Sequence, residues 1–318
     1  MPEDQCHEPG GAAPALAAAV LDSPYLVPFD GSFTLADHAT APDDSETAGR
    51  KRLKKELEEM VRRIADLQRV LYADDRYAVL LVFQAMDAAG KDGTIRKVLS
   101  GVNPAGCHVK SFKQPNAKEL DHDFLWRTTG LLPERGQIGV FNRSYYEEVL
   151  IVRVHPELLV HQKLPHLPEG DELAQFWDQR LESIRCHERH LARCGTVVLK
   201  FWLNVSLEEQ RRRFLSRLDE PEKHWKFSVR DVEERQHWPA YMHAYEQALR
   251  HTSRPWAPWF AIPADDKRFM RREVARIVLA TLESLDVSYP VVAPETRMRH
   301  EEMRQLLEDD FDDGGSGA

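Results

Sequence analysis

The sequence has no long apolar run and few cysteines. A membrane-spanning helix needs about 20 consecutive apolar residues, and no stretch of the 318 residues is that long. The four cysteines include no C-x-x-C pair, so they do not indicate a disulfide framework. The Ala-rich stretch at 12–20 follows acidic rather than basic residues, which is not typical of a signal peptide. We therefore expect a cytoplasmic protein without a membrane partner.

The chain also lacks an excess of positive charge. Its 43 Lys and Arg against 52 Asp and Glu give a formal net charge of -9. A general nucleic-acid binder needs a basic surface, so we expect no nucleic-acid partner. The hydrophobic content of 42% and the charged content of 30% are ordinary for a globular protein, and the length allows one large domain.

A zinc site is weakly indicated at one place only. Cys186, His190 and Cys194 recur every four residues, so on a helix they would form one stripe. A structural zinc site needs a fourth ligand, and its ligands converge on one point rather than extend along several turns. We interpret the stripe as helix surface or core.

The chain is organised around residues 78–98. An apolar run at 78–84 predicts a buried strand, residues 85–90 are mostly small, and a helix can start at Lys91. A strand, a loop of small residues and a helix, in this order, are the context of a P-loop. The loop N–H groups and the helix N-terminus attract an anion, and Lys91 lies where a P-loop lysine reaches phosphate oxygens.

The match to G-x-x-x-x-G-K-S/T is imperfect. Ala85 replaces the first glycine, and Asp92 replaces the Ser or Thr that normally contacts magnesium. Asp87 adds a carboxylate inside the loop, which repels phosphates unless a cation lies between them. Asp87 is therefore predicted to hold Mg²⁺, directly or through water. The alternative is a strand-to-helix turn without a ligand.

Strands and helices alternate along the rest of the chain. Further apolar strands are predicted at 108–112, 138–141, 196–203 and 256–262, and amphipathic helices at 51–71, 117–128, 172–193, 231–251 and 268–285. This alternation predicts an α/β fold with a doubly wound parallel sheet. The polar cluster 142–147 follows a core strand directly, where such sheets bind ligands.

The ends of the chain differ from this central domain. Residues 1–49 are rich in Pro, Gly, Ala, Asp and Ser and predict a mostly disordered N-terminal arm, although its apolar residues at 25–35 can lie on the domain surface. The domain itself is expected at 50–290. Residues 291–318 are expected to form a C-terminal helix and an acidic disordered tail.

Basic residues gather in a segment after the strand at 196–203. Arg213, Arg217, Lys223, Lys226 and Arg230 lie within twenty residues. Basic residues at helical spacing are often a solvated helix face. Small P-loop kinases, however, insert a lid at this place, and phosphoryl transfer needs cations and the exclusion of water. We predict a helical lid at about 211–231.

Three strings together resemble the polyphosphate kinase 2 family. They are residues 84–94, residues 141–149 with 153–155, and residues 220–227, and the similarity extends from about Tyr25 to Pro290. The resemblance implies transfer of the terminal phosphoryl group of inorganic polyphosphate to a nucleotide, with Mg²⁺ or its substitute Mn²⁺. It also implies a P-loop kinase-like three-layer α/β/α fold similar to thymidylate kinase, and a homodimer or homotetramer.

The resemblance and the charge pattern together predict the site. The predicted catalytic residues are Asp87, Lys91, Arg143 and Glu147, of which Asp87 and Glu147 hold the metal. The predicted phosphate- and polyphosphate-binding residues are Ala88, Ala89, Gly90, Asp92, Gly93, Thr94, Lys110, Lys113, Asn142, Arg213, Arg217 and Lys226. The predicted nucleotide-binding residues are Asn116, Asp121, Arg127 and Arg143.

The expected nucleotide acceptor follows from one difference between this sequence and many family members. Many family members have Asp where this chain has Asn142, whose neutral amide adds no charge, and Glu147 can compensate. Members with this Asn-Arg-Ser string resemble class III, which is associated with AMP and ADP. We expect adenine nucleotides as acceptors, with guanine nucleotides as the second candidate. Two other functions stay open, an ATP-dependent kinase of a small metabolite and a non-catalytic nucleotide- or polyphosphate-binding protein.

Overall fold

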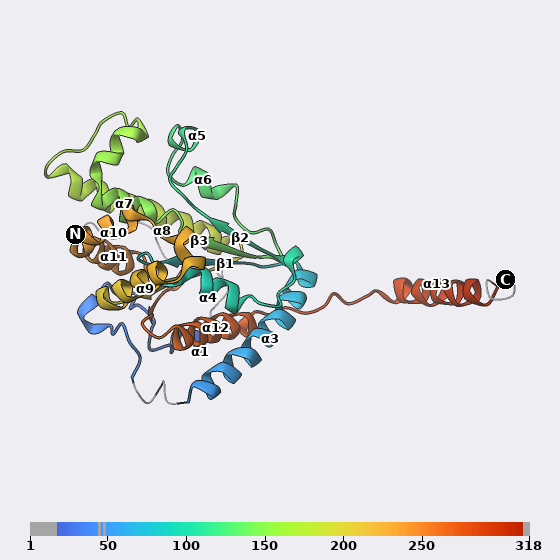
Figure 1. Ribbon diagram of the computed structural model, residues 1–318. Helices are drawn as coiled ribbons and strands as arrows, with labels where there is room; N and C mark the ends of the chain where they lie inside the picture. The colour runs from blue at the N-terminus through green and yellow to red at the C-terminus, as the bar shows by residue number, and fades with distance from the viewer. Residues whose placement is uncertain (1–17, 44–45, 47–48, 314–318) are drawn as a thin grey trace.

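A five-stranded parallel sheet forms the centre of the protein (Figure 1). The computed structural model describes residues 18–43, 46 and 49–313. The strand order is β2-β3-β1-β4-β5, and the bounds are Ala78–Gln84 for β1, Cys107–Ser111 for β2, Ile138–Asn142 for β3, Thr196–Asn204 for β4 and Trp259–Pro263 for β5. Every residue of β1, β3, β4 and β5 is buried, which explains their continuous apolar runs.

Helices cover both faces of the sheet, so the predicted three-layer α/β/α fold is confirmed (Figure 1). One face carries α1 (Ala18–Leu21), α3 (Arg50–Asp74), α4 (Lys91–Val98) and α12 (Lys267–Ser284). The other face carries α7 (Glu147–Val154), α8 (Glu172–Arg193) and α11 (Trp238–Thr252). A parallel sheet covered on both faces places its ligands at the carboxyl ends of the strands.

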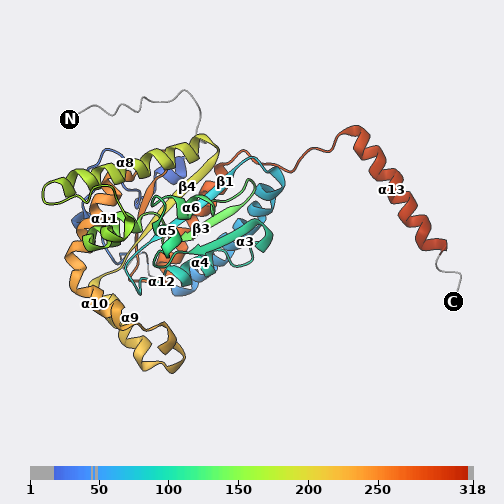
Figure 2. The ribbon, with the colours of Figure 1, turned by 90° about the horizontal axis from the view of Figure 1, so that it is seen from above.

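Short elements occupy the connections. They are α5 (Ala117–Leu120), α6 (Trp126–Thr129), α9 (Leu207–Asp219), α10 (Val229–Glu233) and the 3₁₀ helices η1 (Leu35–Asp37), η2 (Pro104–Gly106), η3 (Pro156–Gln162), η4 (Pro221–Lys226) and η5 (Glu234–His237). The segment from α9 to α10 projects from the domain where the lid was predicted (Figure 2). Of the helices in the described part of the chain, none is long and apolar enough to cross a membrane.

The prediction of one helix over 117–128 is wrong, because α5 and α6 are separate. The Asp123 carboxylate accepts hydrogen bonds from the N–H groups of Leu125 (2.9 Å) and Trp126 (3.2 Å). An Asp side chain that bonds backbone N–H groups two and three residues ahead favours a turn and a new helix start over helix continuation.

Part of the predicted N-terminal arm belongs to the folded domain. The N–H of Val27 donates to the carbonyl of Trp259 at 2.9 Å, and the N–H of Ala261 donates to the carbonyl of Tyr25 at 2.8 Å. These bonds add a short antiparallel bridge to the outer edge of β5. The side chains of Val27 and Phe33 are buried in the core. The expected contact of the apolar residues at 25–35 with the domain is therefore present.

The prediction of disorder over 1–49 does not hold for this segment, because its apolar side chains cover the sheet edge and the core beside it. Residues 1–17 lie outside the described residues. At the other end, α13 (Pro294–Asp313) stands away from the domain in both views (Figures 1 and 2). Acidic residues 308–313, expected in a disordered tail, belong to this helix, and residues 314–318 lie outside the described residues.

Candidate active site

The loop between β1 and α4 curls tightly at the carboxyl end of the central strand. Ala88 has a φ of 63° and Gly90 a φ of 108°, so two of its residues are left-handed. Gly90 tolerates this conformation readily, whereas it strains an alanine. Small residues therefore allow the bend that turns the loop into the N-terminus of α4.

Lys91 folds back onto this loop. Its Nζ donates to the carbonyl of Ala85 at 2.7 Å and lies 3.4 Å from the carbonyl of Met86, and the residue is only 9% exposed. Burial lowers the pKa of Lys91, and the positive charge of Arg143 lowers it further. The Lys91 ammonium therefore lies beside the loop and interacts electrostatically with the guanidinium of Arg143.

Arg143 connects two carboxylates at the end of β3. Its Nη2 lies 2.7 Å from Asp87 Oδ1, and its Nη1 lies 3.2 Å from Glu147 Oε2. Glu147 also accepts a hydrogen bond from Gln84 Nε2 at 2.8 Å. The carboxylate of Glu147 first, and then that of Asp87, raises the pKa of Arg143. The structure thus brings together Asp87, Lys91, Arg143 and Glu147, the four residues with a predicted catalytic role.

Asn142 shows what a neutral amide does at this position. Its Nδ2 donates to Asp92 Oδ1 at 2.6 Å and lies 3.4 Å from Ser111 Oγ. A carboxylate at position 142 would face the carboxylate of Asp92 instead. The amide therefore replaces a repulsive contact with a hydrogen bond.

Two cavities meet at this point. A cavity of about 830 Å³, which we call the basic cavity, is lined by the phosphate loop and a set of cations. These cations are Lys91, Lys113, Arg143, Arg213, Arg217 and Lys267. A second cavity of about 340 Å³, the apolar cavity, lies between the α5–α6 segment, α7 with η3, and the α10–α11 segment. Asp87, Lys113 and Arg143 line both.

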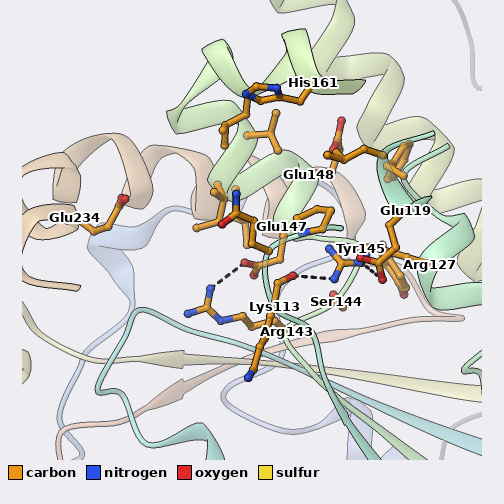
Figure 3. A pocket seen from close by; sticks show the side chains of 18 of the residues that line it. Lys113, Glu119, Arg127, Arg143, Ser144, Tyr145, Glu147, Glu148, His161 and Glu234 are labelled. Atoms are coloured by element: carbon orange, nitrogen blue, oxygen red, sulfur yellow. Dashed lines mark hydrogen bonds and ion pairs between the residues drawn. The ribbon is translucent and has the colours of Figure 1, made fainter. Parts of the chain in front are cut away.

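Figure 3 shows the apolar cavity from close by. Lys113, Arg143 and Glu147 lie at one end, and His161 lies at the opposite end. The apolar part of the lining is formed by Leu120, Phe124, Leu150, Ile151, Leu158, Tyr241 and Tyr245. Charged groups also line other sides of this cavity, among them Glu119, Arg127, Glu148 and Glu234. A space with apolar walls and cationic groups such as Arg143 suits a ligand with a flat apolar part and an anionic part.

Not every predicted nucleotide-binding residue lines a cavity. Asn116 caps α5: its Oδ1 accepts from the N–H of Glu119 at 3.0 Å, and Glu119 accepts from the N–H of Asn116 at 2.9 Å. Asp121 forms an ion pair with Lys163 instead. Arg127 does line the apolar cavity, and it donates to the carbonyl of Lys113 at 2.7 Å.

The predicted phosphate-binding residues also divide. Ala88, Gly90, Asp92, Gly93, Lys113, Asn142, Arg213 and Arg217 line the basic cavity. Thr94 is buried, and its hydroxyl donates to the carbonyl of Gly90 at 3.0 Å. Ala89 and Lys110 are not among the residues that line either cavity, and the side chain of Lys226 is not described. Sequence reasoning missed Lys267, although its place just after β5 was a signal.

The carboxylates of Asp87 and Glu147 suit a magnesium ion whose remaining ligands are substrate phosphates. Among the described residues, no group of three or more His, Cys, Asp and Glu side chains could hold a metal alone. Mg²⁺, however, is commonly bound by one or two carboxylates together with substrate phosphates. Asp87 and Glu147 converge on the same guanidinium beside the phosphate loop, so they meet this requirement. Cys186, His190 and Cys194 lie exposed along α8 and at its end.

A buried ion pair lies behind Arg143. Lys200 Nζ in β4 lies 2.6 Å from Glu188 Oε2 in α8, and both side chains are 0% exposed. The hydroxyls of Tyr145 and Tyr146 each donate to Glu188 Oε1 at 2.9 Å. These tyrosines follow Arg143 by two and three residues, so the ion pair of Lys200 and Glu188 stabilises the backbone next to Arg143.

The sheet order, the loop after its central strand and the adjacent basic cavity define a kinase of the P-loop type, which is an enzyme that transfers phosphoryl groups. The model of the polyphosphate kinase 2 family matches residues 47–290. The chain therefore belongs to the polyphosphate kinase 2 family, and it is a polyphosphate–nucleotide phosphotransferase.

Relatives agree along most of the chain. An ADP-polyphosphate phosphotransferase of Rhodopseudomonas palustris is 58% identical over 79% of this chain and 86% of its own length. An AMP/ADP-polyphosphate phosphotransferase of Meiothermus ruber is 45% identical over 86% of this chain and 96% of its own. The crystal structure of polyphosphate kinase 2 from Arthrobacter aurescens TC1 superimposes with a TM-score of 0.74 at 35% identity, covering 85% of this chain and 93% of that chain.

The two lysines near the end of β2 are expected to differ. Both are exposed, but Lys113 lines both cavities, whereas Lys110 lines neither. Loss of one charge-assisted hydrogen bond to phosphate raises KM about tenfold. We therefore expect Lys113→Ala to raise the KM for polyphosphate about tenfold, and Lys110→Ala to change it less than about twofold. Steady-state kinetics with varied polyphosphate check this, and equal effects of the two substitutions would contradict it.

Proposed function

We propose that the protein moves the terminal phosphoryl group of inorganic polyphosphate to ADP and to AMP. The observation that carries this proposal is the meeting of the basic and apolar cavities at Asp87, Lys113 and Arg143. Two substrates that react with each other need separate sites with one shared boundary. The names of the relatives from Rhodopseudomonas palustris and Meiothermus ruber, which include ADP and AMP/ADP, support these acceptors.

Polyphosphate belongs in the basic cavity. It carries about one negative charge per phosphate, and mutual repulsion with a nucleotide phosphate opposes their approach. Lys91, Arg217 and Lys267 line this cavity together with Arg143. Such a local cluster in a chain of net charge -9 attracts a polyanion to one place while the rest of the surface repels it.

The nucleotide belongs in the apolar cavity. Its base and ribose would lie among the aromatic and aliphatic walls, which include Tyr241 and Phe124. Its phosphates would point to Lys113 and Arg143 at the shared boundary. This orientation brings the terminal acceptor oxygen to the end of the polyphosphate chain.

Catalysis then rests on position and charge. The terminal phosphate oxygen of AMP or ADP is largely ionised near neutral pH, so it attacks in line without a strong general base. Lys91 and Arg143 stabilise the charge on the transferring group. When bound by Asp87 and Glu147, Mg²⁺, or Mn²⁺ in its place, neutralises charge on the phosphate oxygens. Asp87 and Glu147 also orient Arg143 in the free enzyme, because both accept from its guanidinium.

An end-point nucleotide assay tests this proposal. Long-chain polyphosphate and Mg²⁺ are combined with ADP or with AMP, and we expect ATP from ADP, and ADP followed by ATP from AMP. Product from ADP alone would reject AMP as an acceptor. No product from either, with phosphorylation of a small metabolite by ATP, would favour a metabolite kinase. Bound polyphosphate without any turnover would favour a non-catalytic binding protein.

Two further conditions complete the assay, and one separate measurement addresses the oligomeric state. Removal of divalent cations with EDTA is expected to abolish product formation, and added Mg²⁺ or Mn²⁺ to restore it. GDP in place of ADP measures whether guanine nucleotides are accepted, as the name of a GDP-polyphosphate phosphotransferase of Pseudomonas aeruginosa suggests. Light scattering tests the further proposal that the protein is a homodimer or homotetramer.

A further inference from the structure

We infer that Gln210 and Arg213 of α9 are positioning residues that hold the phosphate loop in its anion-binding shape. The proposed function supplies only the identity of the bound anion. For Arg213 the inference replaces the sequence-based expectation of a phosphate ligand. For Gln210 it assigns a role that no sequence motif indicates.

The contacts are made to three successive carbonyls of the loop. Gln210 Nε2 donates to the carbonyl of Asp87 at 3.0 Å. Arg213 Nη1 donates to the carbonyls of Ala88 at 3.1 Å and Ala89 at 2.5 Å. Gln210 is 1% and Arg213 6% exposed, so water competes little for these bonds.

Fixing a carbonyl fixes the next N–H group. In a trans peptide the carbonyl and the following N–H point in opposite directions. Bonds from α9 to the carbonyls of Asp87 and Ala89 therefore turn the N–H groups of Ala88 and Gly90 away from α9. Both residues line the basic cavity. The side chains of α9 thus determine which way the phosphate-binding N–H groups face.

The loop needs such support because its conformation is strained. Ala88 has a φ of 63°, a left-handed conformation that is unfavourable for alanine because its Cβ comes too close to the following carbonyl oxygen. Residues 85–90 also have few large side chains of their own to hold them in place. Strained backbone persists only where the surroundings determine it. Gln210 and Arg213 provide that determination.

Arg213 has no donor left for a phosphate. A guanidinium has five N–H donors. Nε donates to Glu209 Oε1 at 2.6 Å, and Nη1 donates to the two loop carbonyls. Nη2 donates to the carbonyls of Ala264 at 2.6 Å and Asp265 at 3.2 Å. All five are used, so Arg213 joins the phosphate loop to the loop after β5.

Gln210 is itself held in place. Its Oε1 accepts a hydrogen bond from Arg235 Nη1, and Arg235 also donates to the carbonyl of Leu207 at 3.2 Å. The amide is therefore oriented with its NH₂ group toward Asp87. A neutral side chain whose donor is directed at a backbone carbonyl has no reason to affect phosphate binding except through the loop.

Hydrogen exchange of the ligand-free full chain tests the inference. The variants are Gln210→Met, which keeps the length of the side chain and removes the donor, and Arg213→Lys, which keeps the charge and removes the fork. The matched controls are Gln179→Met on α8 and Arg211→Lys, both exposed. Exchange of the Ala89 amide, which donates to the carbonyl of Met86 within the loop, is expected to rise at least about tenfold in the two variants, with β1 and β4 unchanged.

Kinetics provide the second measurement. Both variants are expected to raise the KM for polyphosphate by about tenfold or more, because misplaced binding groups lose affinity, while the nucleotide KM stays within about twofold. Unchanged loop exchange together with lost polyphosphate binding would show that Arg213 is a direct ligand and overturn the inference. Normal exchange and normal kinetics of Gln210→Met would also overturn it.

The two measurements separate this inference from the proposed function. The exchange experiment contains no substrate, so it keeps its meaning even if polyphosphate proves not to be the donor. If Arg213→Lys fails to fold, Gln210→Met carries the test alone, since it removes the hydrogen bonds of Gln210 with Asp87 and Arg235 without a change in charge. Binding of inorganic polyphosphate by calorimetry then replaces turnover as the second readout.

Discussion

Replacing Lys91 by methionine is expected to lower kcat/KM about 10²–10³-fold, because one preorganised charged donor is removed from the transferring phosphoryl group. This loss corresponds to about 3–4 kcal/mol of transition-state stabilisation. Methionine retains most of the side-chain volume at this buried position, so the loop should keep its packing. In the ligand-free enzyme, Lys91 Nζ donates to the carbonyl of Ala85. From there the flexible side chain can move to a phosphate oxygen.

The measurement is steady-state kinetics with polyphosphate and ADP, together with thermal unfolding. Lys97→Met on the same helix is the matched control, since Lys97 lines neither cavity. A loss of activity in Lys91→Met that parallels a large loss of thermal stability would mean that the lysine serves the fold instead. A decrease of less than about threefold in kcat/KM would rule out transition-state stabilisation by Lys91.

Removing the Glu188 carboxylate is expected to destabilise the protein by about 3–5 kcal/mol, because it leaves the charge of Lys200 buried and unpaired. Both side chains are fully buried. Burial lowers the pKa of Lys200, so part of the cost is avoided by loss of its proton at alkaline pH. The hydroxyls of Tyr145 and Tyr146 also lose their shared acceptor.

Urea unfolding of Glu188→Ala checks this value. Glu182→Ala on the same helix is exposed and should change the free energy of unfolding by less than about 0.5 kcal/mol. A double variant, Glu188→Leu with Lys200→Met, removes both charges and should recover much of the stability. If the double variant is no more stable than Glu188→Ala alone, the unpaired charge is not the source of the loss.

Local patterns predicted the central part of the protein well. The strand before the phosphate loop, the loop and Lys91 follow from residues adjacent in sequence, because apolar runs and small residues constrain their own backbone. The meeting of Asp87, Arg143 and Glu147 was also predictable, since parallel strands end at one edge of a sheet. These predictions depended on rules that act within one strand and its loop, or on the common edge at which parallel strands end.

Contacts between distant segments were not predictable in the same way. An arginine that binds phosphate and an arginine that supports the phosphate loop look the same in the sequence. Only the contacts of Arg213 with the carbonyls of Ala88 and Ala89 distinguish the two roles. An asparagine can bind a ligand or cap a helix, and in the structure Asn116 caps α5. The pairing of residues 25–27 with β5 depends on a sheet edge that no local pattern reveals.

The shared boundary of the two cavities has a kinetic consequence. Because a nucleotide can leave the apolar cavity while the basic cavity stays occupied, the donor polymer need not dissociate between turnovers. One chain can then advance by one phosphate and serve the next acceptor. With the two substrates placed as proposed, we therefore expect processive shortening of a long polyphosphate rather than single transfers from many chains.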